Sequence, residues 1–200
     1  MKTFDLIVIG SGAAGLTSAF TALGFGKKVL IIEKHKSGGE CTWSGCVPSK
    51  GLINEAKDVH IARKFSEVNV DTSEVLQRVR QISEGIYEHE TPEVLEAAGA
   101  VFVQGAAQFI SSKVLSVNGE HYRGKKIMIA TGSSPMVPPI PGLESVPYLT
   151  NDNFFEQDSL PSSIIVLGAG AIGMELSQAM NRLGVSVTVI EMTPEVMFRQ

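Results

Sequence analysis

The chain has 200 residues, of which 44% are hydrophobic and 19% are charged, and its formal net charge is −4. This length allows one or two domains with a sizeable core, and the composition is typical of a globular protein. The negative charge gives no reason to expect nucleic acid, and the first apolar run, residues 6–9, is too short for a signal peptide or a membrane span. We therefore expect a cytoplasmic protein with neither a nucleic-acid nor a membrane partner.

Residues 5–34 predict a strand, a glycine turn, a helix and a second strand that ends in Glu33. In such a unit Gly10 permits the turn, Gly12 lets the backbone approach a pyrophosphate, and Gly15 lets the helix pack closely on the sheet. The pyrophosphate binds at the helix start, where unpaired N–H groups and the helix dipole favour negative charge. Glu33 follows Gly10 by 23 positions, a spacing suited to an adenosine ribose. The unit therefore predicts a dinucleotide site.

The only two cysteines, Cys41 and Cys46, are separated by four residues. A pair this close can form and break a disulfide during a reaction. A structural disulfide is not expected in a reducing cytoplasm, so the pair favours a redox or a metal role. Metal is the weaker alternative because zinc sites normally need four ligands and the histidines are scattered. Cys46 lies at a predicted helix start, which favours its thiolate, and we expect Cys41 to be the more accessible thiol.

The middle of the chain predicts two helices followed by short strands. One helix begins near Pro48 and reaches Phe65, and a long polar helix covers residues 72–98 with an interruption at Pro92. Gly119 marks a hairpin turn. The expected strands are residues 101–104, 107–110, 114–117, 121–123 and 126–130.

A proline-rich irregular segment, residues 135–147, precedes a second copy of the dinucleotide unit, with a domain boundary near residues 150–161. A constant shift of 158 residues superimposes residues 5–34 on residues 163–192 without a gap. In this superposition Gly10, Gly12, Gly15 and Glu33 correspond to Gly168, Gly170, Gly173 and Glu191. Only nine residues follow Glu191, fewer than a doubly wound domain needs, so we expect an amino-terminal fragment of a longer protein. Two such sites suggest two dinucleotides, with flavin assigned to the first and nicotinamide to the second.

The sequence of residues 38–50, Gly-Gly-x-Cys-x4-Cys-Val-Pro-Ser-Lys, resembles the active-site signature of the class I pyridine nucleotide-disulfide oxidoreductases. This family includes dihydrolipoamide dehydrogenase, glutathione reductase and mercuric reductase. Residues 130–133 resemble its second flavin motif and residues 105–109 its adenine-contact turn. The resemblance covers essentially the whole chain. It implies an α/β fold, with a three-layer Rossmann-like FAD-binding domain over residues 1–150 that carries a small antiparallel β insertion. Residues 151–200 would begin a second Rossmann-like domain that binds NAD(P).

The resemblance also implies the roles of the site residues. Cys46 corresponds to the thiol nearest the flavin, and Cys41 to the interchange thiol that reacts with substrate. Lys50 corresponds to a lysine near the flavin N5 position, and Glu175 to its carboxylate partner; without the resemblance, both are better interpreted as ordinary surface charges. The expected cofactor-binding residues are Gly10, Gly12, Ala13, Ala14, Gly15, Glu33, Lys34, Gly39, Gly45, Cys46, Lys50, Ala107, Ala130, Thr131, Gly132, Gly168, Gly170, Ala171, Ile172, Gly173 and Glu191.

The implied activity is electron transfer between NAD(P)H and a small-molecule or protein-bound disulfide through FAD and the two cysteines, in a homodimer when the protein is full length. Ser49 and Glu191 favour a dihydrolipoamide dehydrogenase-like enzyme, and a mercuric reductase-like enzyme stays open. A carboxylate at Glu191 favours NAD over NADP because it repels a 2′-phosphate. Relatives that prefer NADPH usually carry arginines at Met192 and Phe198, and the nearby Arg199 leaves NADP open. The other hypothesis is a nucleotide-binding module without turnover.

Overall fold

The computed structural model describes residues 1–197, and the chain divides into two compact units. Unit 1 comprises Met1–Ser44 and Glu84–Tyr148, and unit 2 comprises Gly45–Ser83 and Leu149–Gln200. The fold is α/β with a mainly parallel sheet, which confirms the predicted fold class. The division into cofactor domains at residue 150 stays a prediction, because the compact units follow contacts and divide the chain elsewhere.

Unit 1 contains a six-stranded sheet in the order β3-β2-β1-β6-β5-β4. The strands β3, β2, β1 and β6 are parallel, whereas β5 and β4 extend the sheet in antiparallel fashion. In the pairing of β1 with β2, Leu6 lies opposite Val29 and Ile9 lies opposite Ile32. The bounds are β1 (Lys2–Ile9), β2 (Val29–Glu33), β3 (Val101–Gln104), β4 (Gln108–Ser111), β5 (Val114–Val117) and β6 (Glu120–Ile129).

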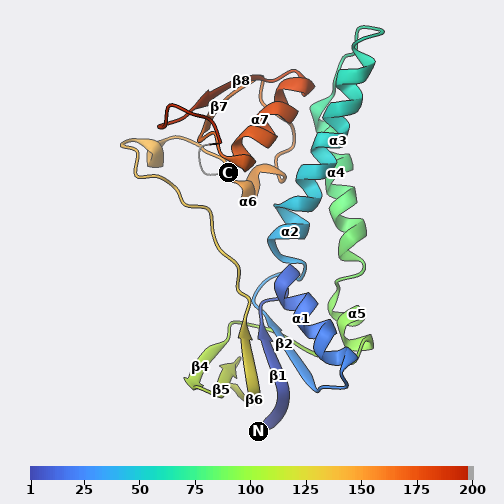
Figure 1. Cartoon of the computed structure of the whole chain (residues 1–200), viewed down its shortest axis with the longest axis vertical. Helices are drawn as coiled ribbons and strands as arrows, with labels where there is room; N and C mark the ends of the chain where they lie inside the picture. Colours follow the sequence, from blue (N-terminus) through green and yellow to red (C-terminus); the bar gives the residue numbers. More distant parts are fainter. Residues whose placement is uncertain (198–200) are drawn as a thin grey trace. The chain divides into compact units, whose positions relative to one another are not determined.

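The parallel strands of unit 1 bury both of their faces, because alternate side chains point to opposite sides of a strand. One face packs under α1 (Ala13–Gly24) and α5 (Pro92–Ala97), and Figure 1 shows α1 lying against β1 and β2. The other face packs against β5 and against Tyr122 near the start of β6, where β6 pairs with β5 in antiparallel fashion. Helices, parallel strands and antiparallel strands therefore form the three predicted layers. The helix-side core includes Val8, Val29, Ile31, Leu16 and Leu95, and the opposite core includes Ile7, Leu30, Ile32, Leu115 and Val117.

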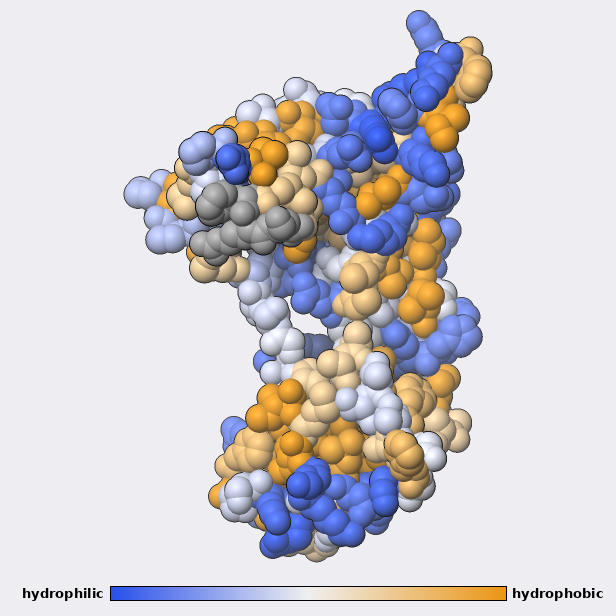
Figure 2. Space-filling view, in the orientation of Figure 1, coloured by the Kyte–Doolittle hydropathy of each residue, from blue (hydrophilic) through white to orange (hydrophobic). Residues whose placement is uncertain are grey.

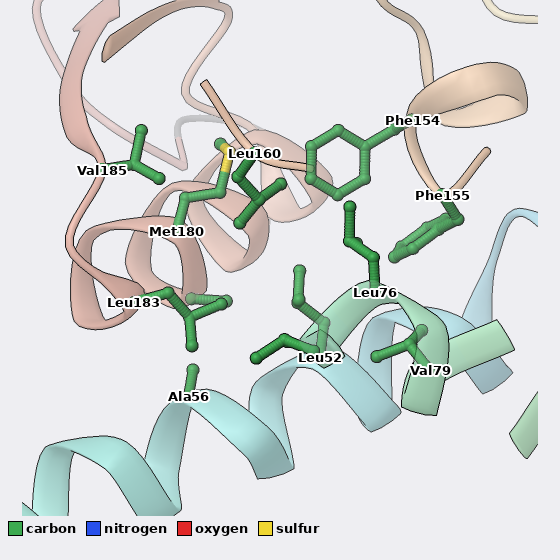
Figure 3. Close-up of a cluster of buried hydrophobic side chains, with 12 residues drawn as sticks. Leu52, Ala56, Leu76, Val79, Phe154, Phe155, Leu160, Met180, Leu183 and Val185 are labelled. Atoms are coloured by element: carbon green, nitrogen blue, oxygen red, sulfur yellow. The ribbon is translucent and has the colours of Figure 1, made fainter. Parts of the chain in front are cut away.

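Unit 2 pairs two parallel strands with helices. The helices α3 and α4 pack with α7 through one apolar cluster, in which Leu52, Leu76 and Met180 meet Phe154 and Phe155 (Figure 3). Polar residues cover most of the visible outer surface of the α3–α4 hairpin (Figure 2). The bounds are α3 (Cys46–Ala62), α4 (Thr72–Tyr87), α6 (Asn151–Phe154), β7 (Ser163–Leu167), α7 (Ala171–Leu183) and β8 (Ser186–Ile190).

Several predicted elements differ from the observed ones. Residues 121–123 and 126–130 were expected as two strands, but β6 runs continuously because Gly124 is buried within it, where a Cβ would lie 2.9 Å from the Lys126 carbonyl oxygen. The helix over residues 72–98 is interrupted as predicted, but the break covers residues 88–91 and Pro92 is the first residue of α5. A short helix, α2 (Gly39–Trp43), was not expected.

Other predictions are confirmed. The strands β3 and β5 have the expected bounds, and Asn118 and Gly119 both have positive φ, as a tight hairpin turn requires. The proline-rich segment contains only the 3₁₀ turn η1 (Leu143–Ser145). No helix in residues 1–197 combines the length and apolar character needed to cross a bilayer.

Candidate functional site

The first glycine turn, between β1 and α1, is held by contacts that only glycine permits. Gly10 has a φ of +100°, and its N–H donates to the Ile32 carbonyl at 2.8 Å. A Cβ on Gly10 would overlap the Ala130 carbonyl, and one on Gly15 would overlap the Gly10 carbonyl. The sequence therefore uses these two glycines for the turn and for the close packing of α1, as predicted.

The segment that opens the cysteine signature lies directly against this turn. The Gly38 N–H donates to the Ser11 carbonyl at 3.0 Å, and Gly38 forms an isolated parallel bridge with Gly12. Gly39 has a φ of +63°, and a Cβ there would lie 2.6 Å from the Gly12 Cα. Two glycine segments far apart in the sequence thus approach each other at the backbone, and Cys41 follows by two residues.

The start of α1 suits a dinucleotide phosphate. Gly12 is the N-cap, so no side chain caps the helix, and the first turn carries no acidic residue. Ala13 and Ala14 begin the helix there. Unpaired N–H groups at such a start, together with the helix dipole, attract negative charge. The start of α1 can therefore present backbone N–H groups to a diphosphate.

Glu33, at the end of β2, fixes the geometry of the same turn. Its carboxylate accepts hydrogen bonds from the Ser11 N–H at 2.7 Å, the Ser11 hydroxyl at 2.9 Å and the His35 N–H at 2.8 Å. Ser11 is fully buried, and Lys34 beside Glu33 is exposed. The prediction that Glu33 accepts ribose hydroxyls is not tested, but the structure adds a second role, the bracing of the turn.

The other two predicted flavin segments lie near the carboxyl ends of the parallel strands of unit 1. The Ala130 N–H donates to the Ile9 carbonyl at 2.8 Å, and Thr131 and Gly132 continue from there. The Gly105 N–H donates to the Glu33 carbonyl at 2.7 Å, which places this turn, and Ala107 two residues later, beside the end of β2. Nucleotides bind at this edge in open α/β sheets.

The second glycine turn, between β7 and α7, repeats the first. Gly168 has a φ of +102°, its N–H donates to the Ile190 carbonyl at 2.8 Å, and a Cβ on Gly173 would overlap the Gly168 carbonyl. Gly170 is the N-cap of α7, followed by Ala171 and Ile172. The turn can therefore present backbone N–H groups to a second diphosphate.

Glu191 stabilises the second turn through hydrogen bonds, as Glu33 stabilises the first. Its carboxylate accepts hydrogen bonds from the Ala169 N–H at 2.7 Å and the Thr193 N–H at 2.9 Å. These bonds, the backbone bond from Ala169 foremost, hold the pKa of Glu191 below its usual range, so the carboxylate stays ionised. Two neighbours considered for NADP binding, Phe198 and Arg199, lie outside the described residues.

Within unit 2 the structure brings together three predicted catalytic residues. Cys46 is the first residue of α3, with Gly45 as N-cap, and Lys50 follows one turn later. The Lys50 Nζ lies 2.6 Å from the Glu175 Oε1 of α7. The prediction that Glu175 pairs with Lys50 is therefore confirmed in the structure.

The ion pair shifts the pKa of both partners toward the charged forms. The hydrogen bond to Glu175 raises the pKa of Lys50, and attraction to Cys46 acts in the same direction. The hydrogen bond from Lys50 lowers the pKa of Glu175, and Ser49 contributes a further hydrogen bond. Lys50 thus remains a cation one helical turn from Cys46.

No disulfide joins Cys41 and Cys46, and the structure contains both as thiols. The side chain of Cys46 is exposed, whereas that of Cys41, within α2, is half-buried. The prediction that Cys41 is the more accessible thiol is therefore wrong in this structure. Sequence alone did not indicate α2, whose flanking contacts reduce the exposure of Cys41. The redox role of the pair stays a prediction.

Several contacts around Cys41 have no counterpart in the sequence predictions. Thr42 donates a hydrogen bond to the Glu90 carboxylate, and the Trp43 N–H donates to the Ser37 carbonyl at 2.7 Å. The Trp43 ring also contacts that of Tyr87. Trp43, the last residue of α2, is half-buried. No sequence pattern signals contacts between segments almost fifty residues apart.

Within residues 1–197, no group of three or more His, Cys, Asp or Glu side chains is placed to hold a metal ion.

Comparison with known proteins gives a consistent result. Residues 4–200 match the family model described as pyridine nucleotide-disulphide oxidoreductase. The chain is 34% identical over 196 residues to a mercuric reductase of Lysinibacillus sphaericus, covering 94% of this chain and 36% of the relative. It is 35% identical over 205 residues to a dihydrolipoyl dehydrogenase of Thermus scotoductus, covering 98% and 44%.

Solved structures agree with these sequence relatives. The HOCl-induced flavoprotein disulfide reductase RclA from Escherichia coli, in its Cu(II) complex, superimposes with a TM-score of 0.84 at 28% identity, covering 98% of this chain and 43% of that one. A further structure of RclA gives a TM-score of 0.85. The chain thus spans less than half the length of these proteins.

Proposed function

The chain belongs to the pyridine nucleotide-disulphide oxidoreductase family, and from that premise we propose that it is the amino-terminal part of an FAD-dependent enzyme. This enzyme passes electrons between NAD(P)H and a disulfide through Cys41 and Cys46. Family membership implies an oxidoreductase that uses flavin and a pyridine nucleotide. The finer assignment of donor, acceptor and thiol roles is the proposal.

The observation that carries the proposal is the arrangement of Cys46, Lys50 and Glu175. Cys46 lies at a helix start, Lys50 lies one turn further along the same helix, and Glu175 holds the ammonium group at 2.6 Å. A cysteine at a helix start with a fixed ammonium group one turn away is an arrangement typical of a reactive thiol. An ordinary surface ion pair would not need a cysteine at this position, whereas a thiol that donates electrons to a flavin does.

The chemistry of the two cysteines balances without a metal ion. In the reducing direction, the Cys41 thiolate attacks a substrate disulfide, forms a mixed disulfide and releases one substrate thiol. The Cys46 thiolate then attacks Cys41, which closes the Cys41–Cys46 disulfide and releases the second substrate thiol. Two electrons and two protons return the pair to its thiols. FAD, when bound at the first glycine turn, supplies this two-electron link to the nicotinamide.

We propose NAD(H) as the nucleotide at the second turn. Glu191 is braced by the Ala169 and Thr193 N–H groups, and its lowered pKa keeps it anionic. An anion at this position accepts ribose hydroxyls and repels a 2′-phosphate.

Ser49 and Glu191 favour a dihydrolipoamide dehydrogenase-like activity in the full-length protein. Reduction of mercuric ion is the second candidate, favoured because mercuric reductases of three Gram-positive species match this chain at 34–35% identity. For the whole protein we also propose a homodimer in the cytoplasm.

The visible absorbance of the FAD-reconstituted chain tests the proposal. On mild reduction we expect a long-wavelength thiolate–flavin band in the wild-type chain. Cys46→Ser should abolish this band and leave FAD bound, whereas Cys41→Ser should retain it because the Cys46 thiolate remains. A band that persists in the Cys46→Ser variant would reverse the assignment of the two thiols. A chain that binds FAD but forms no such band would support the hypothesis of a nucleotide-binding module without turnover.

A further inference from the structure

Cys41 lies in a helix that cannot hold its position alone. The helix α2 has five residues, far fewer than an isolated helix needs in water. It begins at Gly39, and both Gly38 and Gly39 have positive φ, a conformation that glycine adopts without steric cost. The location of the Cys41 thiol must therefore be set by contacts between α2 and the rest of unit 1.

Glu90 provides two of these contacts, one on each side of the Gly38–Gly39 pair. The Thr42 hydroxyl donates to the Glu90 Oε2 at 2.8 Å, and the Ser37 hydroxyl donates to the Glu90 carbonyl. Thr42 and Ser37 are each only 2% exposed, so both hydrogen bonds are shielded from water. Thr42 is the immediate neighbour of Cys41, and its anchor therefore fixes the cysteine backbone.

Tyr87, the last residue of α4, provides a further contact and precedes Glu90 by three residues. Its ring lies 5.1 Å from the Trp43 ring at an interplanar angle of 58°. The Lys36 ammonium lies over both rings, at 3.4 Å from the Trp43 centroid and 4.2 Å from the Tyr87 centroid. Such cation–aromatic contacts are attractive, and they hold the carboxyl end of α2 as Glu90 holds its middle.

We propose that Glu90 and Tyr87 are positioning residues for the Cys41 thiol. Through Thr42 and Trp43 they hold α2 in place, limit the exposure of Cys41 and restrict the four-residue loop that must close when Cys41 bonds to Cys46. Neither residue reacts. The functional part of this inference rests on the proposed redox role of the pair, whereas the positioning part does not.

Alkylation of the fully reduced chain by iodoacetamide, followed at each cysteine by mass spectrometry, tests the positioning. In Glu90→Ala and Tyr87→Leu we expect the Cys41 rate to rise about tenfold, the equivalent of one lost hydrogen bond. The Cys46 rate serves as the internal reference and should stay unchanged. Glu90→Gln keeps an acceptor for the Thr42 hydroxyl and should restore the wild-type rate.

Two controls keep this test decisive. Glu88→Ala removes an exposed carboxylate from the same segment and should change neither rate. Thr42→Val removes the donor of the same hydrogen bond at nearly constant side-chain volume. It should raise the Cys41 rate as Glu90→Ala does, and it replaces Glu90→Ala in the test if Glu90→Ala folds poorly. A Cys41 rate that stays at the wild-type value in Thr42→Val and Tyr87→Leu would overturn the proposal.

Equilibration with oxidised and reduced dithiothreitol tests the functional consequence. Cys41 and Cys46 each lose a proton and together lose two electrons to form one disulfide, while oxidised dithiothreitol gains both. We expect Glu90→Ala to lower the equilibrium constant for this ring closure about tenfold, or about 30 mV, because the loop is less preorganised. An unchanged constant would show that the anchors do not serve the redox pair. A wild-type pair that forms no disulfide at any ratio would instead refute the proposed function, and the alkylation result would still stand.

Discussion

The two glycine turns of this chain have the same local geometry in very different surroundings. The Gly10 and Gly168 N–H groups donate to the Ile32 and Ile190 carbonyls, each at 2.8 Å. Glu33 and Glu191 each accept a hydrogen bond at 2.7 Å from the N–H of the residue after that glycine. The first turn belongs to a six-stranded sheet, whereas the second belongs to a two-stranded one. The comparison shows that some thirty residues encode the turn, but the strands around it determine how much apolar surface is buried.

The strands of the two units differ in how many of their residues are buried. In β2, Val29 to Ile32 are buried, because β1 and β3 flank the strand and cores lie on both faces. In β7 and β8, alternate residues are exposed, including Ile165 at 63% and Ile190 at 51%. Apolar residues of the same kind therefore contribute to stability in unit 1 and are partly in contact with water in unit 2.

The two glutamates also differ in how a hydroxyl assists them. Glu33 is bonded by the Ser11 hydroxyl, within the glycine turn, whereas the equivalent residue of the second copy is Ala169. There the Thr193 hydroxyl lies 3.2 Å from the Glu191 carboxylate, and its proton is shared with the Glu195 carbonyl at 2.9 Å. Each glutamate therefore accepts a hydroxyl hydrogen bond, but from a different part of its unit.

The largest expected difference between the units is at the first glycine. Gly10→Ala combines backbone strain with overlap on the Ala130 carbonyl, and we expect it to lower the free energy of unfolding by about 4 kcal/mol. Gly168→Ala has nearly the same φ but open space around the Cβ, so the loss should be about 1–2 kcal/mol. Urea unfolding followed by circular dichroism, with Trp43 fluorescence as a probe of unit 1, measures both. Equal losses would contradict the account of the first turn.

A second comparison concerns the strands. Leu30→Ala removes a fully buried side chain from β2 and should cost about 3 kcal/mol, as large-to-small core substitutions do. Ile165→Ala removes a largely exposed one from β7 and should cost less than about 1 kcal/mol in this chain. The same unfolding experiment applies. A large loss for Ile165→Ala would show that β7 is covered in solution.

The smallest expected effect is electrostatic and belongs to the second unit alone, because Thr17 occupies the position in α1 that Glu175 occupies in α7. Lys50→Met should return the pKa of Glu175 to the ordinary range, as read by NMR titration of its carboxyl carbon. Since the folded-state pKa is lowered, the stabilisation is present above the ordinary glutamate pKa of about 4.3 and is lost as the pH falls through the lowered value. The exposed pair should contribute less than about 1 kcal/mol.

Lys57→Met is the matched control for this titration, because Lys57 is exposed on the same helix. It should leave the pKa of Glu175 unchanged. If Lys50→Met also left it unchanged, the ion pair would not form in solution.

Sequence reasoning was most successful where the structural cause is local. Both glycine turns depend on residues within one strand–helix–strand unit, so spacing alone located Gly10, Gly15, Gly168 and Gly173. Sequence reasoning failed where the burial or the contacts of a residue depend on a segment far away in the sequence. Two strands, 121–123 and 126–130, were predicted where β6 is continuous, because no local pattern shows that Gly124 is buried inside it. The exposure of Cys41 depends on contacts with residues 87–90, which no pattern connects to it. Glu175 was found only through family resemblance, since its partner Lys50 lies 125 positions away.

The central claim is that the first glycine turn seats the diphosphate of FAD, and Gly12→Ala tests it most directly. Gly12 has an ordinary φ of −79°, and a Cβ there would make only a normal contact of 3.6 Å with the Gly39 Cα, so the fold should tolerate the change. The added methyl group would nevertheless occupy the backbone's closest approach to the diphosphate. We measure the FAD bound per chain by absorbance, with Gly170→Ala as the control. The account predicts that Gly170→Ala binds FAD as the wild-type chain does and that Gly12→Ala binds at least about tenfold more weakly; full FAD binding by Gly12→Ala would contradict it.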